Sequence, residues 1–162
     1  MSEHRGQCLC GAVVYSVTAP PQRITVCHCR FCQRATGGPY LIEPIFARED
    51  WQVLEGQPKV HNHRSAGSGK VIHVHFCADC GTKIAYSFER FPDAVGVLSG
   101  TFDDPAWFDG STPHMRHIFT GVARPGTIIP PGVDTYVEHV AAADGSPNAP
   151  VVFDAFHEIP HR

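Results

Sequence analysis

Three cysteines fall within the six residues 27–32, whose sequence is CHCRFC, and this density of sulfur constrains the chain more than any other feature. Two further pairs flank the stretch, Cys8 with Cys10 before it and Cys77 with Cys80 after it. All seven cysteines therefore belong to three tight clusters. The spacings C-x-C, C-x-C-x-x-C and C-x-x-C are too close for easy mutual disulfides, but they suit thiolates that converge on one ion. We interpret the clusters as metal sites.

The length and charge of the chain limit the other interpretations. A chain of 162 residues most simply forms one domain with a real core. The net charge is −3 with histidine neutral, so no electrostatic field favours nucleic acid or anionic lipid, and we expect neither as a partner. No stretch approaches the ~18 apolar residues of a membrane span, and no apolar leader follows the start. The expected location is the cytoplasm, a reducing compartment where metal-bound cysteines are favoured over disulfides.

Short segments rich in β-branched and aromatic residues recur along the chain, with Gly, Pro and Asp between them. The sequence predicts strands at residues 12–18, 24–26, 40–46, 51–55, 59–64, 70–76, 82–88, 94–98 and 117–122. About one helical turn is expected at residues 32–36, before the Gly-Gly-Pro of residues 37–39, and a short helix at residues 137–143. No long amphipathic helix is apparent. The fold class predicted is therefore all-β, with few or short helices.

Seven thiols divide naturally into four and three. A structural zinc ion takes four tetrahedral ligands, whereas a catalytic one takes three protein ligands plus water or substrate. Cys10 and Cys80 are each followed by glycine, which tolerates the positive φ of a metal-binding turn, whereas Cys32 is followed by glutamine. We therefore predict two zinc ions per chain. The closed structural site is expected on Cys8, Cys10, Cys77 and Cys80, and the open site on Cys27, Cys29 and Cys32.

An open site of three thiolates suits the making or breaking of a carbon–sulfur bond. Zinc favours the ionised form of a substrate thiol, and such a thiolate adds to the carbonyl carbon of an aldehyde whose oxygen is polarised. An alternative is that His28, a side chain from another loop or a cysteine of a neighbouring molecule completes the triad. The protein would then hold two structural zinc ions.

Other polar residues carry both a functional and a structural interpretation. The pairs His61/His63 and His73/His75 have strand spacing, so they could be acid–base groups or simply histidines on an exposed strand face. Asp103 and Asp104 most simply serve the turn before a proline.

Three patterns together resemble a known family. They are GQCLCGAVVY at residues 6–15, CHCRFCQRATG at residues 27–37 and FCADCGT at residues 76–82. They are similar to the glutathione-dependent formaldehyde-activating (GFA) family, which also includes centromere protein V, and GTFDDP at residues 100–105 and HIF at residues 117–119 resemble its downstream segments. The resemblance covers residues 6–136. It leaves residues 137–162 as a C-terminal extension of unknown role, and docking of this segment is one route to a homodimer.

The resemblance implies a β-tent fold of antiparallel sheets with zinc knuckles. It places a structural zinc on the positions of Cys8, Cys10, Cys77 and Cys80 and a catalytic zinc on those of Cys27, Cys29 and Cys32, in agreement with the division inferred from the glycines. It also implies an activity like that of S-hydroxymethylglutathione synthase, which joins glutathione and formaldehyde. The leading hypothesis is a zinc-dependent carbon–sulfur lyase that acts on an adduct of a small thiol, such as glutathione, and an aldehyde. The alternative is a non-catalytic zinc-binding module that holds a protein partner.

Overall fold

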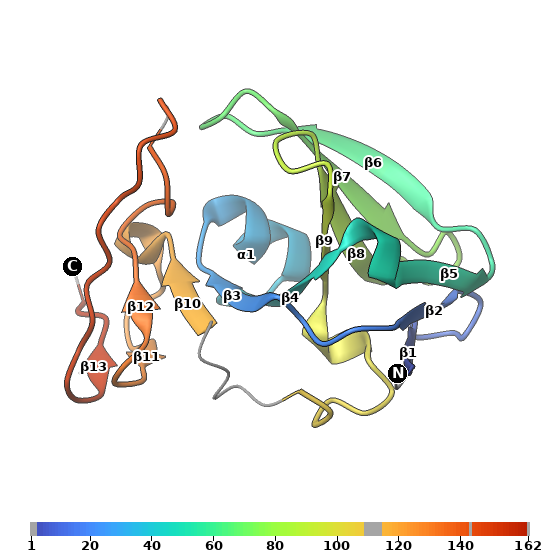
Figure 1. The fold of residues 1–162 in the computed structure, drawn as a ribbon, viewed down its shortest axis with the longest axis horizontal. Coiled ribbons are helices and arrows are strands. Elements are labelled where there is room, and N and C mark those ends of the chain that lie inside the picture. Colours follow the sequence, from blue (N-terminus) through green and yellow to red (C-terminus); the bar gives the residue numbers. More distant parts are fainter. Residues whose placement is uncertain (1–2, 109–114, 143, 162) are drawn as a thin grey trace. The chain divides into compact units, whose positions relative to one another are not determined.

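The computed structural model describes residues 3–108, 115–142 and 144–161, which are dominated by short strands (Figure 1). The strands are β1 (His4–Gln7), β2 (Val14–Val17), β3 (Arg23–Cys27), β4 (Leu41–Ala47), β5 (Trp51–Glu55), β6 (Lys59–Arg64), β7 (Val71–Phe76), β8 (Lys83–Phe88), β9 (Ala94–Val97), β10 (Met115–Ile118), β11 (Ile128–Ile129), β12 (Asp134–Thr135) and β13 (His157–Glu158). The α-helix is α1 (Arg30–Thr36), and the 3-10 turns are η1 (Arg48–Asp50), η2 (Ser99–Thr101) and η3 (Thr120–Val122). The all-β fold class is confirmed. Within these residues, no helix is long and apolar enough to cross a membrane.

The chain forms two compact units. The first consists of Met1–Arg23 and Glu43–Thr112, and the second of Ile24–Ile42 and Pro113–Arg162. The four-cysteine cluster lies within the first unit and the three-cysteine cluster within the second, so each candidate site is built from the elements of a single unit.

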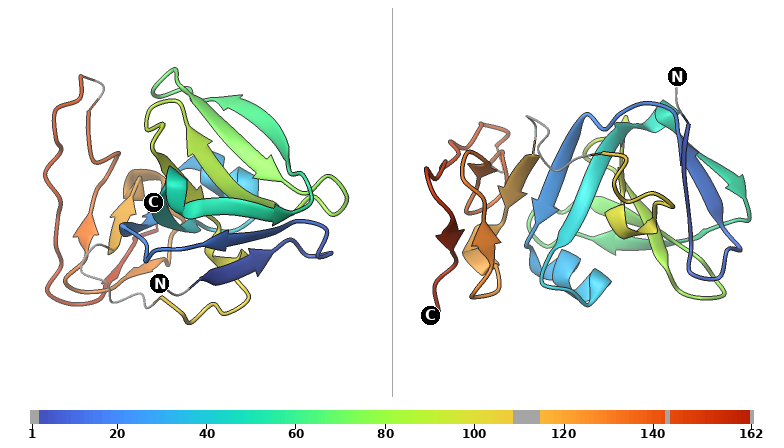
Figure 2. Two further views of the ribbon diagram at one scale, coloured as in Figure 1. Left: turned by 45° about the vertical axis from the view of Figure 1, so that its right-hand side comes forward. Right: turned by 90° about the horizontal axis from the view of Figure 1, so that it is seen from below.

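The first unit contains two antiparallel sets of strands. One set has the order β1-β2-β5, and the other runs β4-β9-β8-β7-β6. Strand β8 buries three consecutive residues, Ile84, Ala85 and Tyr86, which is typical of a strand covered on both faces. Strand β6, the polar sequence KVHNHR, lies at the edge, where charged side chains discourage pairing with another chain. The hairpin of β6 and β7 appears in green to yellow-green in both views of Figure 2.

The hairpin of β7 and β8 is closed by cysteines. The strands pair antiparallel up to Phe76 and Lys83, with a register shift at His75/Phe76, and residues 77–82 form the turn. Within it, Cys77 N–H donates to the carbonyl of Thr82 at 2.9 Å. The cysteine turn thus joins the strands that were predicted at residues 70–76 and 82–88. Cys77 is also buried in the core of the first unit, together with Cys8, aromatic residues and valines.

The second unit is organised around β10, which pairs in parallel with β3 on one side and with β12 on the other. The register places Ile118 opposite Cys27 and His117 opposite Thr135. The C-terminal segment after β12 remains in the same unit, and its strand β13 pairs antiparallel with β11. A small core of Ala123, Ile129 and Ile159 includes the buried residue of β11.

Most predicted strands are found within one or two residues of their expected bounds, and β5 and β6 have the predicted bounds. The segment 117–122 differs, because β10 ends at Ile118 and the chain then turns. Phe119 adopts a positive φ of 59°, unusual for a residue with a side chain, and starts the 3-10 turn of Thr120–Val122. Strand β1 and the two-residue strands were not predicted, since β1 has the polar sequence HRGQ and two residues carry no periodicity.

The helix predicted at residues 137–143 is wrong. Residues 137–142 form no helix, and residue 143 lies outside the described residues. The carbonyls of Val137 and Glu138 instead accept hydrogen bonds from Gly121 and Phe119, at 2.9 and 2.8 Å. Backbone groups used in this way are not available for helical pairing, so contacts with another segment override the local preference.

Candidate metal centres

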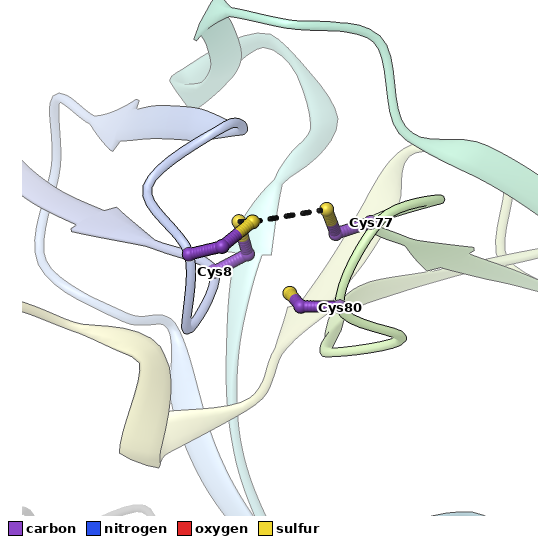
Figure 3. Close-up of side chains that lie close together, drawn as sticks. Cys8, Cys77 and Cys80 are labelled. Carbon is purple, nitrogen blue, oxygen red and sulfur yellow. Dashed lines mark hydrogen bonds between the residues drawn. The ribbon is translucent and has the colours of Figure 1, made fainter.

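The four-cysteine cluster is formed by two turns that come from distant parts of the chain (Figure 3). Their sulfur atoms all lie within 4.8 Å of one another. The Sγ atom of Cys10 is 3.6 Å from that of Cys8 and 3.8 Å from that of Cys77. A tetrahedral zinc ion with bonds of ~2.3 Å to sulfur requires sulfurs about 3.8 Å apart. The donor set therefore fits a four-coordinate ion.

The two turns of this cluster are built alike. In each, the amide of the first cysteine donates to the residue five positions later, Cys8 to Val13 at 3.0 Å and Cys77 to Thr82 at 2.9 Å. In each turn, the second cysteine is followed by a glycine with positive φ, 75° for Gly11 and 73° for Gly81, as the sequence predicted. The backbone thus curves around the sulfurs, and the amide of Val13 also donates to Cys8 Sγ at 3.3 Å. Such contacts stabilise negative charge on sulfur.

Thr82 joins the two turns. Its hydroxyl lies 3.1 Å from the Sγ atom of Cys80 and accepts a hydrogen bond from the amide of Leu9 at 3.2 Å. The hydrogen bond between Thr82 and Cys80 lowers the pKa of this half-buried thiol to about 5. The side chain of Thr82 thereby contributes both to the charge on one sulfur and to the alignment of the other turn.

The three-cysteine cluster is local. Cys27 ends β3, Cys29 is the N-cap of α1 and Cys32 lies in the first turn of the helix. The Sγ atom of Cys29 accepts a hydrogen bond from the amide of Cys32 at 3.3 Å, and the three sulfurs lie within 4.8 Å of one another. Among residues 3–108, 115–142 and 144–161, no fourth Cys, His, Asp or Glu joins this group. The structure thus brings together the seven cysteines as four and three, as predicted.

The three thiols of this cluster share a negative charge. Hydrogen bonds with Cys27 and with Cys32 lower the pKa of Cys29 to about 3. The same contacts raise the pKa of the other two thiols, that of Cys27 through Cys29 and that of Cys32 through Cys27. The hydrogen bonds within the group thus favour the ionised form of Cys29, and a bound divalent ion would favour the ionised form of all three thiols.

His28 lies between two of these cysteines but does not belong to the sulfur group. It is fully buried, with 0% of its surface exposed, and its ring Nε2 atom lies 3.0 Å from Nδ1 of His117. The two rings are stacked with an interplanar angle of 22°. Burial lowers the pKa of both histidines to about 4, so both are neutral at pH 7. The sequence drew attention to His28, whereas His117, 89 residues away, was noted only as part of the HIF segment that resembles the family and was given no role.

Gln33 is a second residue to which the sequence assigned no role, although it follows Cys32 in the CHCRFCQRATG pattern. Its side-chain amide donates to the carbonyl of His28 at 2.6 Å and to that of Val122 at 3.0 Å. The glutamine that distinguishes Cys32 from the cysteines followed by glycine therefore ties the turn to η3.

The other histidines and aspartates considered from the sequence lie outside both cysteine groups. His73 Nδ1 contacts the side-chain oxygen of Asn62 at 2.7 Å, and His75 Nε2 contacts Ser87 Oγ at 2.9 Å. Asp104 accepts a hydrogen bond from the amide of Ala106 at 2.9 Å, which agrees with a role in the turn.

Comparison with known proteins shows to which family the chain is similar. The family model described as glutathione-dependent formaldehyde-activating enzyme matches residues 3–122. A protein of Halomonas elongata, named "Putative glutathione-dependent formaldehyde-activating enzyme", is 26% identical over 101 residues, which cover 60% of this chain and 64% of that protein. An uncharacterized lyase of Schizosaccharomyces pombe is 25% identical over 117 residues, covering 67% of this chain and 81% of its own length.

A solved structure supports the fold. The crystal structure of a Rhodobacter sphaeroides protein aligns with a TM-score of 0.51 and 21% identity, covering 65% of this chain and 91% of that one. This likeness concerns the fold alone. The chain matches less than two thirds of the length of its Halomonas relative, but the family model covers most of the chain, including all seven cysteines. The chain belongs to the glutathione-dependent formaldehyde-activating enzyme family.

Proposed function

We propose that the protein is a zinc-dependent carbon–sulfur lyase that acts on the adduct of a small thiol and an aldehyde, as glutathione and formaldehyde would form. The observation that carries the proposal is the difference between the two cysteine groups. One offers four sulfurs, whereas the other offers three, with no fourth Cys, His, Asp or Glu beside them in the described part of the chain. Membership of the family, and the lyase name of the fission yeast relative, support the same reaction class.

The two groups are assigned different roles in this proposal. Cys8, Cys10, Cys77 and Cys80 would hold a structural zinc, and Cys27, Cys29 and Cys32 a catalytic zinc. A zinc ion bound to three thiolates supplies a soft Lewis-acid position that favours the ionised form of an incoming thiol. Cys27 and Cys32 are buried, whereas Cys29 is half-buried. A ligand from solvent would therefore reach the triad from the side of Cys29.

The reaction proposed is balanced without an oxidant or a reductant. In the synthetic direction, the thiol sulfur forms a bond to the aldehyde carbon while the carbon–oxygen double bond opens to a single bond. The oxygen takes up the proton that the thiol releases, so the hydroxymethyl thioether contains all atoms of both reactants. Cleavage reverses these steps.

The experiment that tests this function compares the wild-type protein with Cys29→Ser. The exchange of glutathione with S-hydroxymethylglutathione in the presence of formaldehyde is followed by exchange NMR, with zinc per chain measured on the same samples. We expect the wild type to accelerate exchange and to hold two zinc ions. The variant should hold one ion, keep its circular dichroism spectrum and fall to the uncatalysed rate.

The opposite results are equally definite. A folded Cys29→Ser protein that turns over at the wild-type rate would refute the catalytic role of the triad. A wild type that holds two ions but accelerates no thiol–aldehyde pair would favour the zinc-binding module that holds a protein partner.

A further inference from the structure

The turn that carries the three-cysteine centre is held at its middle residue. The amide of His28 donates to the carbonyl of Ile118 at 3.0 Å, and the carbonyl of His28 accepts from Gln33 at 2.6 Å. The ring of His28 adds a third contact through His117, at 3.0 Å. Backbone donor, backbone acceptor and side chain are therefore all fixed, and two of these three contacts lead to β10.

The contact between the rings of His28 and His117 is buried, and it constrains both rings. His28 has 0% and His117 5% of its surface exposed, so neither ring can readily exchange its partner for water. The hydrogen bond between Nε2 of His28 and Nδ1 of His117 requires one nitrogen to donate and the other to accept, so the tautomers of the two rings are coupled.

His28 has no second hydrogen bond to keep its ring in place. Its Nδ1 atom is buried and makes no hydrogen bond to any residue that the structure describes. Loss of the contact with His117 would leave both ring nitrogens buried without partners, a costly arrangement that the turn would relieve by moving.

His117 itself is held firmly. It lies in β10 between Val26 of β3 and Thr135 of β12, and its carbonyl accepts a hydrogen bond from the amide of Tyr136 at 2.8 Å. A residue that orients a metal-binding turn works best from such a rigid element.

We propose that His117 is a positioning residue of the three-cysteine centre. Through His28 it holds the turn in the conformation in which the three sulfurs converge, and it thereby sets how tightly this centre retains its ion. The inference rests on the proposed zinc ion at the triad and names a residue that controls it. Residues that orient ligands from behind in this way change metal affinity by roughly 10–100-fold when replaced.

The test compares two replacements of His117 in the full chain. His117→Leu removes the ring nitrogens, whereas His117→Asn keeps a polar group near the position of Nδ1. The control is His157→Leu, in the same unit, which removes a ring stacked on Phe153 at 3.9 Å. Zinc-loaded proteins are challenged with a graded chelator and alkylated, and peptide mass spectrometry then identifies the cysteines that have become free.

We expect His117→Leu to release the ion of Cys27, Cys29 and Cys32 at about 10–100-fold lower chelator concentration, and His117→Asn to recover part of this loss. The four-cysteine centre should be unchanged in all variants, and His157→Leu should behave as the wild type. Equal retention at the triad in wild type and His117→Leu would overturn the inference. Equal losses at both centres in both His117 variants would do so too, since they would indicate only a general loss of stability. A wild type with no ion at the triad would instead refute the proposed function on which the inference depends.

Discussion

The amide of Leu9 donates a hydrogen bond to the hydroxyl of Thr82, 3.2 Å away and 73 residues later in the chain. The same hydroxyl lies 3.1 Å from the sulfur of Cys80, so one small side chain connects the two turns of the four-cysteine centre. Thr82→Val keeps the shape of this side chain but removes its polar atom. We expect the free energy of unfolding to fall by ~0.5–1.5 kcal/mol for the lost hydrogen bonds, and zinc to leave this centre more readily.

Denaturant unfolding and the chelator titration described above measure both effects. The matched control is Thr18→Val, which removes one hydrogen bond, to Asp50 at 3.3 Å, in the same unit but outside the cysteine turns. If both variants lose zinc at the same chelator concentration, Thr82 has no special role.

The glycines after the cysteine pairs offer a second prediction. Gly81 has a φ of 73°, and a Cβ atom built there meets no atom within 4 Å, so replacement by alanine introduces backbone strain without a clash. Gly81→Ala should therefore destabilise the protein by roughly 1–2 kcal/mol. Gly67→Ala is the control, because Gly67 also has open space around it but no positive φ. Equal midpoints of thermal unfolding for the two variants would contradict the backbone explanation.

The two metal centres should be distinguishable by fluorescence. Both tryptophans of the chain, Trp51 and Trp107, belong to the first unit, together with the four-cysteine centre. Trp51 is buried in the same core as Cys8 and Cys77, and Trp107 packs against this core. A mild chelator that empties only the triad should leave the emission maximum unchanged. A strong chelator that also empties the four-cysteine centre should shift it to longer wavelength, since removal of a structural zinc costs much of the folding free energy.

Zinc release and emission are recorded together in this titration. A shift of the emission maximum with the first ion released would mean that the assignment of open and closed centres is reversed. Zinc that remains at Cys27, Cys29 and Cys32 after the mild chelator would also contradict the assignment of this group as the open centre.

The burial of His117 gives a pH prediction. Its pKa is lowered to about 4 in the folded protein from 6.5, so the unfolded chain binds more protons between these values. Stability contributed by neutral His117 is complete above about pH 6.5 and is lost as the pH falls toward 4. The ring of His28, which contacts His117 at 3.0 Å, also has a pKa lowered to about 4.

The measurement is the free energy of unfolding at pH 7 and at pH 5, with excess zinc present in both. The wild type should lose more stability on acidification than His117→Leu, which lacks the titrating ring. Identical losses in the two proteins would show that His117 does not titrate in the folded state in the way its burial implies.

Several features of the fold could be predicted because they depend on local pattern. The alternation of β7 and the polar breaks around β5 and β6 specified these strands, and the glycine after Cys80 specified a turn that the structure confirms. The division of the cysteines followed from coordination chemistry and from the glycines after Cys10 and Cys80. The metal, its count and the role of each cysteine stay predictions, as do the boundary at residue 136 and the homodimer.

Other features depend on contacts that no local pattern encodes. The helix expected at residues 137–143 is replaced by hydrogen bonds to residues 119–121, and these form because β12 pairs with β10. In the same way His117 becomes important because the parallel pairing of β10 and β3 places it beside the turn of His28. A sequence without such pairing information predicts the cysteines at the site but not the residues that hold them.

The four-cysteine centre has a consequence for synthesis on the ribosome. Its first two sulfurs, on Cys8 and Cys10, are made early, but their partners on Cys77 and Cys80 emerge only after about seventy further residues. The three sulfurs of residues 27–32 emerge almost together, although their contacts with residues 117–122 can form only after about ninety further residues. The nascent chain can therefore assemble the local three-thiolate group before the four-cysteine group. Its first two thiols must remain reduced until the second turn is complete.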